Sequence, residues 1–193
     1  MKVAIFASGN GSNFEAIAQS EELKQAGLEI EVLVCDQPKA HVIKRAEKYH
    51  IPVFVNRLAD FANRSDYEQA IIDKLKPLGI EYILLAGYMK VVTTTLLSAY
   101  PNHIINIHPS LLPKYSGLEA IERAYEANDR VTGVTIHYID EGVDTGPIIK
   151  QCKVVRLRND TEDSLEQRIH QTEHQMYVEV IHDLLNKNNG VGK

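Results

Sequence analysis

The sequence has no tryptophan, only two cysteines and no long apolar run. Cys35 and Cys152 are too few for a disulfide framework, and they lack the paired spacing of a zinc site. No stretch approaches the ~18 apolar residues that a membrane-spanning helix needs. The apolar run after Met1 is too short for a secretory signal. We therefore predict a cytoplasmic protein with reduced thiols and no membrane partner.

An excess of basic residues is also missing. The chain has 21 Lys and Arg against 26 Asp and Glu, which gives a formal net charge of −5. Proteins that bind nucleic acids generally show a basic footprint, so we expect no nucleic-acid partner. An anionic small ligand is still compatible with this charge, because a few backbone donors can bind one locally. The 193 residues are enough for a single domain over 1–193.

Short apolar runs alternate with amphipathic segments through the first half of the chain. Strands are predicted at 3–7, 31–36, 52–56, 82–86 and 104–107, and helices from Phe14 to Ala18 and at 41–49 and 66–75. This alternation predicts a mostly parallel sheet with helices on both faces, as in Rossmann-like α/β folds. Longer strands at 131–139 and 147–155 predict antiparallel additions in the C-terminal half, with helices at 117–127 and 161–185.

A glycine-rich turn separates the first strand from the first helix. It reads Gly-Asn-Gly-Ser-Asn over residues 9–13, and its backbone N–H groups stand at the positive end of a helix dipole. Gly9 and Gly11 allow an anion to approach closely, and Ser12 and Asn13 can cap the helix or donate to phosphate oxygens. We predict that the turn binds one phosphate, with a plain strand-to-helix turn as the alternative.

Neither common nucleotide-binding motif is complete in this turn. Phe14 stands where Gly-x-Gly-x-x-Gly needs its third glycine, and no Gly-Lys-Ser/Thr follows. Asp36, however, ends the second strand, where dinucleotide-binding folds place an acid that holds the ribose. A nicotinamide-dependent dehydrogenase is therefore an alternative, and it would be recognised by nicotinamide-dependent absorbance changes.

Asn106 and His108 are two residues apart at the end of a predicted strand, so both side chains point to one side. Open α/β sheets bind ligands at this carboxyl edge. An amide and a charged imidazole aimed at one point could stabilise an acyl-transfer oxyanion, and the imidazole could relay a proton. Asp144, in the loop 140–147, is the candidate carboxylate that keeps the imidazole charged. A buried structural histidine is the alternative for His108 alone.

Four segments together resemble the folate-dependent formyltransferases of purine synthesis, within them the phosphoribosylglycinamide formyltransferase family. They are residues 9–13, Leu-Ala-Gly-Tyr-Met at 85–89, Asn-Ile-His-Pro-Ser-Leu-Leu-Pro-Lys-Tyr at 106–115, and Asp-Glu-Gly-Val-Asp-Thr-Gly-Pro at 140–147. The similarity runs in order over residues 1 to about 185. It implies the formyltransferase fold, with a phosphate-binding half over about 1–100 and a catalytic and folate-binding half over about 101–193.

The resemblance also implies an activity. Members of the family transfer the formyl group of 10-formyltetrahydrofolate to the amine of 5'-phosphoribosylglycinamide, giving formylglycinamide ribonucleotide and tetrahydrofolate. It implies two small-molecule substrates, no metal, and a monomer or homodimer. The alternatives are a hydrolase of the same folate, a formyltransferase acting on another amine, and a non-catalytic folate- or nucleotide-binding protein.

The resemblance assigns roles to individual residues. The catalytic group is Asn106, His108 and Asp144. Residues implied to bind the ribonucleotide are Gly11, Ser12, Asn13, His170 and Glu173. Residues implied to contact the folate are Arg64, Met89, Lys90, Val91, Val92, Asn106, Asp140, Glu141, Gly142, Val143 and Asp144.

The chain departs from the family pattern at three positions. Lys90 replaces a frequent arginine and gives a less directional cation for the acidic tail of the folate. His170 stands where a longer polar or basic residue is frequent, and Glu119 replaces a histidine near the site. His170 also begins a His-x-x-Glu-His sequence that matches a zinc-peptidase motif; a surface helix face is the favoured interpretation of it.

Overall fold

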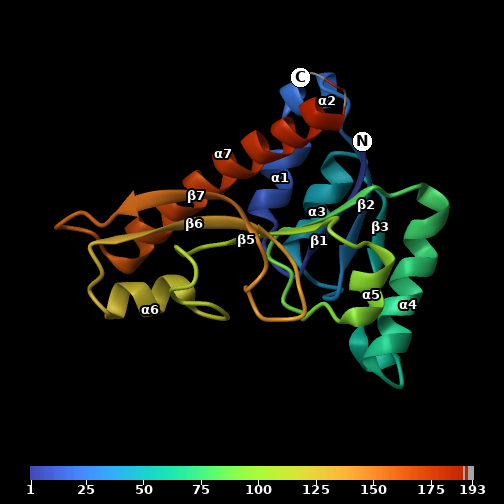
Figure 1. The fold of residues 1–193 in the computed structure, drawn as a ribbon, viewed down its shortest axis with the longest axis horizontal. Coiled ribbons are helices and arrows are strands. Elements are labelled where there is room, and N and C mark those ends of the chain that lie inside the picture. The colour runs from blue at the N-terminus through green and yellow to red at the C-terminus, as the bar shows by residue number, and fades with distance from the viewer. Residues whose placement is uncertain (189, 191–193) are drawn as a thin grey trace.

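A computed structural model describes residues 1–188 and residue 190, in which all strands join one sheet (Figure 1). The strands are β1 Lys2–Ala7, β2 Glu29–Cys35, β3 Val53–Val55, β4 Tyr82–Leu85, β5 Ile104–His108, β6 Val131–Tyr138 and β7 Ile148–Val155. The helices are α1 Ser12–Ala18, α2 Glu21–Gln25, α3 His41–Lys48, α4 Arg64–Leu75, α5 Thr94–Ala99, α6 Ala120–Glu126 and α7 Glu162–Asn188, with 3₁₀ turns η1 Leu58–Asp60 and η2 Lys76–Leu78.

The sheet is mixed, as the sequence pattern predicts. Its strand order is β3-β2-β1-β4-β5-β6-β7, and the pairings from β3 to β5 are parallel. The last two pairings, β5 with β6 and β6 with β7, are antiparallel. The predicted Rossmann-like class with antiparallel C-terminal strands is therefore confirmed. It places the carboxyl ends of the parallel strands at one edge.

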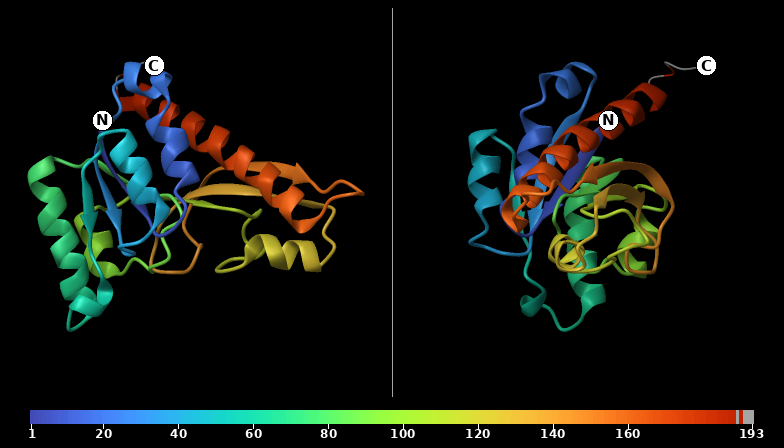
Figure 2. Two further views of the ribbon diagram at one scale, coloured as in Figure 1. Left: turned by 180° about the vertical axis from the view of Figure 1, so that it is seen from behind. Right: turned by 90° about the vertical axis from the view of Figure 1, so that its left-hand side faces the viewer.

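Two apolar cores cover the two faces of the sheet. Side chains of β1 alternate between them, with Val3 and Ile5 in the core under α1, α3 and α7, and Ala4 and Phe6 in the core under α4 and α5. Figure 2 shows these two sets of helices on opposite sides of the strands. Each fully buried large apolar side chain contributes roughly 1.5–3 kcal/mol of transfer free energy. The alternation explains why β1 is apolar from Val3 to Ala7.

The long helix α7 is tied to the centre of the sheet by Tyr177. This side chain is fully buried, and its hydroxyl lies 3.0 Å from the carbonyl oxygen of Leu85 and 3.2 Å from that of Ile105. Burial raises the pKa of Tyr177 well above its usual value, so the group stays a neutral donor. The bond fixes α7 against the ends of β4 and β5, beside the sheet edge that carries the candidate site.

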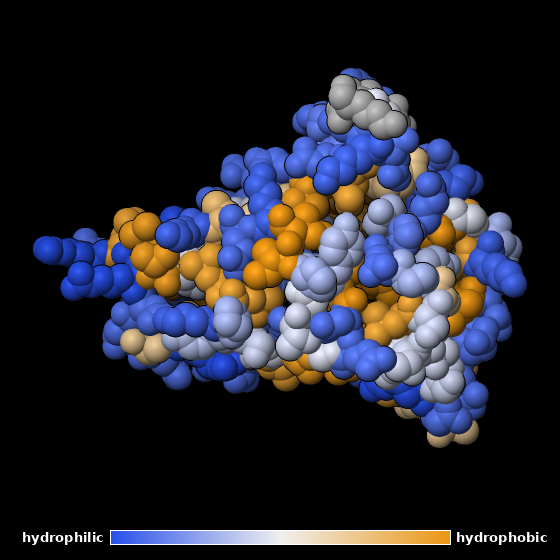
Figure 3. Space-filling view, viewed as in Figure 1, coloured by the Kyte–Doolittle hydropathy of each residue, from blue (hydrophilic) through white to orange (hydrophobic). Residues whose placement is uncertain are grey.

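The structure refines several predicted boundaries. The predicted helix at 117–127 begins only at Ala120, because Gly117 and Glu119 have positive φ angles. The short helices α2 and α5 are absent from the sequence-based prediction, since five and six residues show too little periodicity to detect. None of the described helices is long and apolar enough to cross a membrane. On the face viewed in Figure 3, hydrophobic residues gather near the middle with hydrophilic ones around them.

Candidate active site

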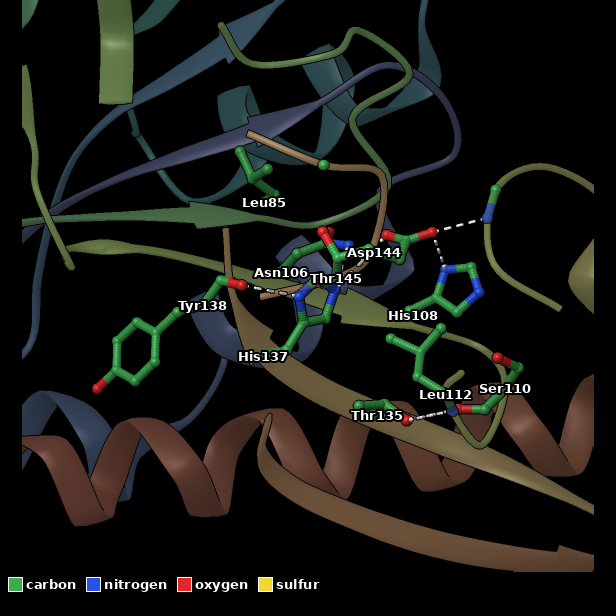
Figure 4. A network of polar contacts seen from close by, with 12 residues as sticks. Leu85, Asn106, His108, Ser110, Leu112, Thr135, His137, Tyr138, Asp144 and Thr145 are labelled. Carbon is green, nitrogen blue, oxygen red and sulfur yellow. Dashed lines mark hydrogen bonds and ion pairs between the residues drawn. The ribbon is translucent and has the colours of Figure 1, made fainter. Parts of the chain in front are cut away.

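Strand β5 presents Asn106 and His108 on one side, as their spacing predicts. The neighbouring strand β6 runs antiparallel, and its register places His137 opposite Asn106 and Thr135 opposite His108. His108 is 6% exposed and His137 is fully buried. Two strands therefore deliver four polar side chains to a single location, which Figure 4 shows from close by.

Asp144 reaches this cluster from the loop between β6 and β7. One of its carboxylate oxygens, Oδ2, lies 3.4 Å from His108 Nδ1 and accepts a 2.7 Å hydrogen bond from the backbone N–H of Gly117 (Figure 4). The other ring nitrogen of His108, Nε2, lies 2.8 Å from the carbonyl oxygen of Tyr115. Both imidazole nitrogens thus face acceptors, an arrangement that suits a ring protonated on both sides.

Asp144 is built to remain ionised. Its side chain is 12% exposed, and burial alone would raise its pKa. Hydrogen bonds from His137 and from the Gly117 amide, with the positive charge of the two histidines, outweigh burial and hold the pKa of Asp144 below its usual value. The site therefore keeps a carboxylate beside His108 at neutral pH.

His137 lies between Asn106 and Asp144. Its Nδ1 lies 2.8 Å from the carbonyl oxygen of Tyr138, which can only accept, so Nδ1 carries a proton. Its Nε2 faces Asn106 Nδ2 at 3.3 Å and Asp144 Oδ1 at 3.6 Å. His137 belongs to no motif that would single it out in the sequence. Its place on the predicted strand 131–139 was visible, but the register that sets it opposite Asn106 was not.

The proline-containing loop after β5 is held by polar contacts to β6 and β7. Thr135 Oγ1 donates to the carbonyl oxygen of Ser110 at 2.7 Å and accepts from the backbone N–H of Leu112 at 3.1 Å (Figure 4). Gln151 on β7 donates to Thr135 Oγ1 and to the Leu112 carbonyl oxygen, at 2.9 and 3.0 Å. These contacts satisfy backbone groups of Ser110 and Leu112 in a loop without regular secondary structure, and they fix the approach to His108.

A cavity of about 360 Å³ opens beside Asn106 and Asp144. Its walls are mostly apolar, which suits a planar aromatic ligand with a few polar groups. The lining includes most of the predicted folate residues, together with the segment after the proline-containing loop. These residues are Leu85, Tyr88, Met89, Lys90, Val91, Val92, Asn106, Pro109, Gly117, Leu118, Glu119, Ala120, Ile139, Gly142, Val143 and Asp144.

Three predicted folate residues stand outside this lining. Asp140 shapes the loop, because its Oδ1 accepts from the Gly142 N–H at 3.0 Å and from Thr145 Oγ1 at 2.6 Å. Glu141 is exposed beside it. Arg64 donates from Nη1 to the carbonyl oxygen of Val91 at 2.8 Å, which places its guanidinium near the rim.

Lys90 is paired inside the molecule as well as facing the cavity. Its ammonium lies 3.6 Å from the carboxylate of Asp36, whose side chain is fully buried. Gln37 Nε2 also donates to Asp36, at 3.1 Å. Asp36 thus compensates the charge of a lysine at the cavity, which is a different use from holding the ribose of a dinucleotide.

The glycine-rich turn is shaped by its packing on α3. Gly11 has φ +79°, and a Cβ there would lie 2.3 Å from Val42 Cγ2. Arg45 donates to both the backbone and side-chain oxygens of Asn10, at 2.9 and 2.8 Å. Asn13 is the second residue of α1. Its buried Oδ1 has no hydrogen-bond partner among the described residues. A polar atom of this kind points to a partner supplied by a ligand or water.

The predicted ribonucleotide residues on α7 form a pair of their own. Glu173 is 4% exposed, and its Oε2 lies 2.6 Å from His170 Nδ1. The hydrogen bond to Glu173 raises the pKa of His170, although burial acts to lower it. Burial lowers the pKa of His174, and the charges of His170 and Arg45 lower it further, although Glu173 acts in the opposite direction. This turn of α7 therefore lies near Arg45, the residue that holds Asn10.

The His-x-x-Glu-His sequence does not assemble a metal centre in the part of the chain that the structure describes. No group of three or more His, Cys, Asp and Glu side chains there is arranged to hold an ion. His170 is instead engaged with Glu166 and Glu173.

Comparison with known proteins agrees with this geometry. The formyl transferase family model matches residues 1–181. The chain belongs to the formyltransferase family.

Three similar proteins within the family carry the name phosphoribosylglycinamide formyltransferase. The chain is 50% identical to the phosphoribosylglycinamide formyltransferase of Bacillus subtilis over 97% of its own length and 96% of the relative's. A crystal structure of phosphoribosylglycinamide formyltransferase from Bacillus halodurans is 47% identical, with a TM-score of 0.93 and 97% of each chain covered. That of the Streptococcus pneumoniae protein is 45% identical, with a TM-score of 0.89, covering 95% of this chain and 98% of the other.

The formyltransferase structure brings together most, but not all, of the residues predicted for the site. Asn106, His108 and Asp144 meet at one point, and the cavity beside them contains Lys90. Beyond His137, Tyr115 contributes a backbone carbonyl that no side-chain pattern could reveal. The Gly11 turn and the Glu173 pair lie on α1 and α7, which pack against each other.

Proposed function

We propose that this protein transfers the formyl group of 10-formyltetrahydrofolate to the amine of 5'-phosphoribosylglycinamide. The products are formylglycinamide ribonucleotide and tetrahydrofolate. The observation that carries this proposal is the His108–Asp144 pair, 3.4 Å apart beside an apolar cavity that Asn106 also lines. The names of relatives that share about half of the sequence over nearly the whole chain support the same reaction.

In the proposed reaction, the amine nitrogen of the glycinamide attacks the formyl carbon, and the carbonyl oxygen becomes an oxyanion. The amide of Asn106 donates to that oxygen, while the imidazolium of His108 acts on it through its charge. The carboxylate of Asp144 lies 3.4 Å from His108 Nδ1, where it can pair with that charge. The bond between the formyl carbon and N10 then breaks, and the proton lost by the amine is taken up by N10. His108 has both nitrogens engaged in the resting site, so water is the more direct proton carrier.

Each substrate has a proposed place. The ribonucleotide phosphate is placed on Gly11, Ser12 and Asn13, where the backbone N–H groups of the turn and the Ser12 hydroxyl can donate to its oxygens. Glu173, with His170, holds the glycinamide end. The two ends are then fixed by α1 and α7, which pack together. Bringing the two substrates together removes much of the entropic cost of the reaction.

The folate is proposed to fill the cavity beside Asn106. Apolar side chains of Met89, Val91, Val92 and Val143 would contact its ring system, and the backbone of loop 140–144 would surround the pterin. Lys90 and Arg64 would meet its acidic tail. This arrangement is supported by the mostly apolar lining and by two cations near the cavity mouth. We further propose that the enzyme acts in the cytoplasm as a monomer or homodimer.

An absorbance assay for tetrahydrofolate formation tests the proposal. The reaction is started with 10-formyltetrahydrofolate and run with the ribonucleotide, with the dephosphorylated riboside, or with no acceptor. We expect rapid product formation only with the ribonucleotide, because the phosphate turn should position the amine. Equal rates without an acceptor would identify a hydrolase. No reaction with any acceptor would leave a binding protein as the correct account.

A further inference from the structure

The segment 115–119 makes one wall of the cavity and also contacts the proposed catalytic pair. Gly117, Leu118 and Glu119 line the cavity. The carbonyl oxygen of Tyr115 lies 2.8 Å from His108 Nε2, and the N–H of Gly117 donates to Asp144 at 2.7 Å. The position of this backbone therefore sets the orientation of both His108 and Asp144.

This backbone does not adopt its conformation without help. Tyr115, Gly117 and Glu119 have φ angles of +53°, +79° and +57°. Residues with a Cβ rarely adopt this left-handed region because of steric crowding, so two of these three positions are unfavourable. Glu119 also lies at the N-terminus of α6 without a side-chain cap. The segment must be held by contacts from outside it.

Arg123, one turn into α6, supplies such contacts. Its Nη1 donates to the carbonyl oxygens of Ser116 and Leu118, at 2.8 and 3.2 Å. Its guanidinium carbon lies 5.4 Å from the ring centroid of Tyr115, within the range of a cation–π contact. A single exposed side chain thus contacts Tyr115, Ser116 and Leu118.

A second attachment acts on the start of the segment only. The hydroxyl of Tyr115 donates to Asp129 Oδ2 at 2.9 Å, and Lys114 pairs with the same oxygen at 2.9 Å. Neither Lys114 nor Asp129 hydrogen-bonds to the backbone of 116–118, which contains the Gly117 N–H. In that backbone, Asp144 accepts from the Gly117 N–H, and Arg123 bonds the carbonyl oxygens of Ser116 and Leu118 on either side of it.

We propose that Arg123 is a positioning residue that holds segment 115–119 closed against His108 and Asp144 and so keeps bulk water from attacking the formyl carbon. This inference rests on the proposed function. When the wall opens, a water oxygen can attack the formyl carbon in place of the amine. The bond to N10 then breaks, formate leaves, and N10 takes up a proton from the water. Loosening the wall therefore converts transfer into hydrolysis.

The test compares Arg123→Met, which keeps the length of the side chain, with Arg123→Lys, which keeps its charge. Arg130→Ala, which removes an exposed arginine just before β6, is the matched control. For each full-length protein, formate release without an acceptor is measured beside transfer to the ribonucleotide, together with KM for both substrates and the thermal unfolding midpoint.

Hydrogen bonds from a charged donor are strong enough to shift a closed-to-open ratio by about tenfold. We expect Arg123→Met to lower transfer kcat about tenfold and to raise the ratio of formate release to transfer by a similar factor. KM for the ribonucleotide and the unfolding midpoint should stay near wild type. Arg123→Lys should recover part of the loss, since one ammonium can reach the same carbonyls, and Arg130→Ala should behave as wild type.

Two results would overturn the inference. One is an Arg123→Met enzyme whose kcat and hydrolysis ratio equal those of wild type. The other is a proportional loss of both activities with a lowered unfolding midpoint, which marks a purely structural role. Failure of the proposed function is a separate outcome, because wild-type protein would then show no transfer that depends on the ribonucleotide.

Discussion

Replacing Gly11 by alanine tests how tightly the glycine-rich turn is built. The φ angle of +79° costs a residue with a Cβ about 1–2 kcal/mol. The added Cβ would also lie 2.3 Å from Cγ2 and 2.5 Å from Cβ of Val42, which is fully buried. Forcing a carbon into a packed site costs typically 1–3 kcal/mol more. We therefore expect Gly11→Ala to destabilise the protein by about 2–5 kcal/mol.

Gly79→Ala separates the two contributions. Gly79 has a similar φ of +67°, but the nearest atom to an added Cβ is Lys2 Cδ at 3.9 Å. Only the backbone cost should appear there, about 1–2 kcal/mol. Urea denaturation of both variants gives the free energies of unfolding. In Gly11→Ala, the KM for the ribonucleotide should rise as well, because α3 must move away from the turn.

Rescue by a smaller neighbour gives a further check. Val42→Ala removes the nearest colliding atom but leaves its Cβ, so it should relieve part of the clash in Gly11→Ala. A favourable coupling on the order of 0.5–3 kcal/mol is expected in the double-mutant cycle. The reasoning is refuted if the free energy of unfolding of Gly11→Ala lies within ~0.5 kcal/mol of the wild-type value, which is the spread of neutral surface substitutions.

The remaining predictions concern charge and catalysis. Asn106→Ala should lower kcat by about 10²–10³ through loss of one oxyanion donor, and unchanged kcat would remove Asn106 from the mechanism. The lowered pKa of Asp144 stabilises the fold above its unfolded value near pH 4, and this contribution is lost as pH falls through the folded pKa. Asp144→Asn should therefore weaken the acid dependence of the unfolding free energy below about pH 4, and an unchanged dependence would contradict the ion pair. The raised pKa of His170 has the opposite sign: its stabilisation is present below about pH 6.5 and is lost as pH rises through the folded pKa. His170→Gln should make the unfolding midpoint less dependent on pH between about pH 6 and 8. A pH dependence equal to that of wild type would show that His170 and Glu173 do not pair in solution.

The local sequence pattern predicts much of the architecture. The alternation of buried strands and amphipathic helices predicts the parallel part of the sheet, because each pattern follows from its own period. The spacing of Asn106 and His108 likewise places them on one side of β5. Short helices such as α5 are not predicted, because the six residues Thr94–Ala99 hold too few apolar positions to show a helical period.

The distant parts of the site depended on register and on backbone atoms. His137 meets Asn106 only because β6 pairs with β5 in a particular register, which the sequence does not display. The Tyr115 carbonyl and the Gly117 N–H act through the main chain, and they are brought in by a left-handed backbone around Glu119. Asp144 is a candidate partner of His108 from its place in the loop 140–147, and the family resemblance implies the same residue, but no local spacing fixes the pairing.

A double-mutant cycle on kcat between His108→Gln and Asp144→Asn tests most directly whether these residues act as one unit. Each change should lower transfer by orders of magnitude in a protein that unfolds cooperatively. The double variant should be no slower than the worse single variant, because groups that act together are strongly non-additive. Effects that multiply in the double variant would show two independent contributions and contradict the account.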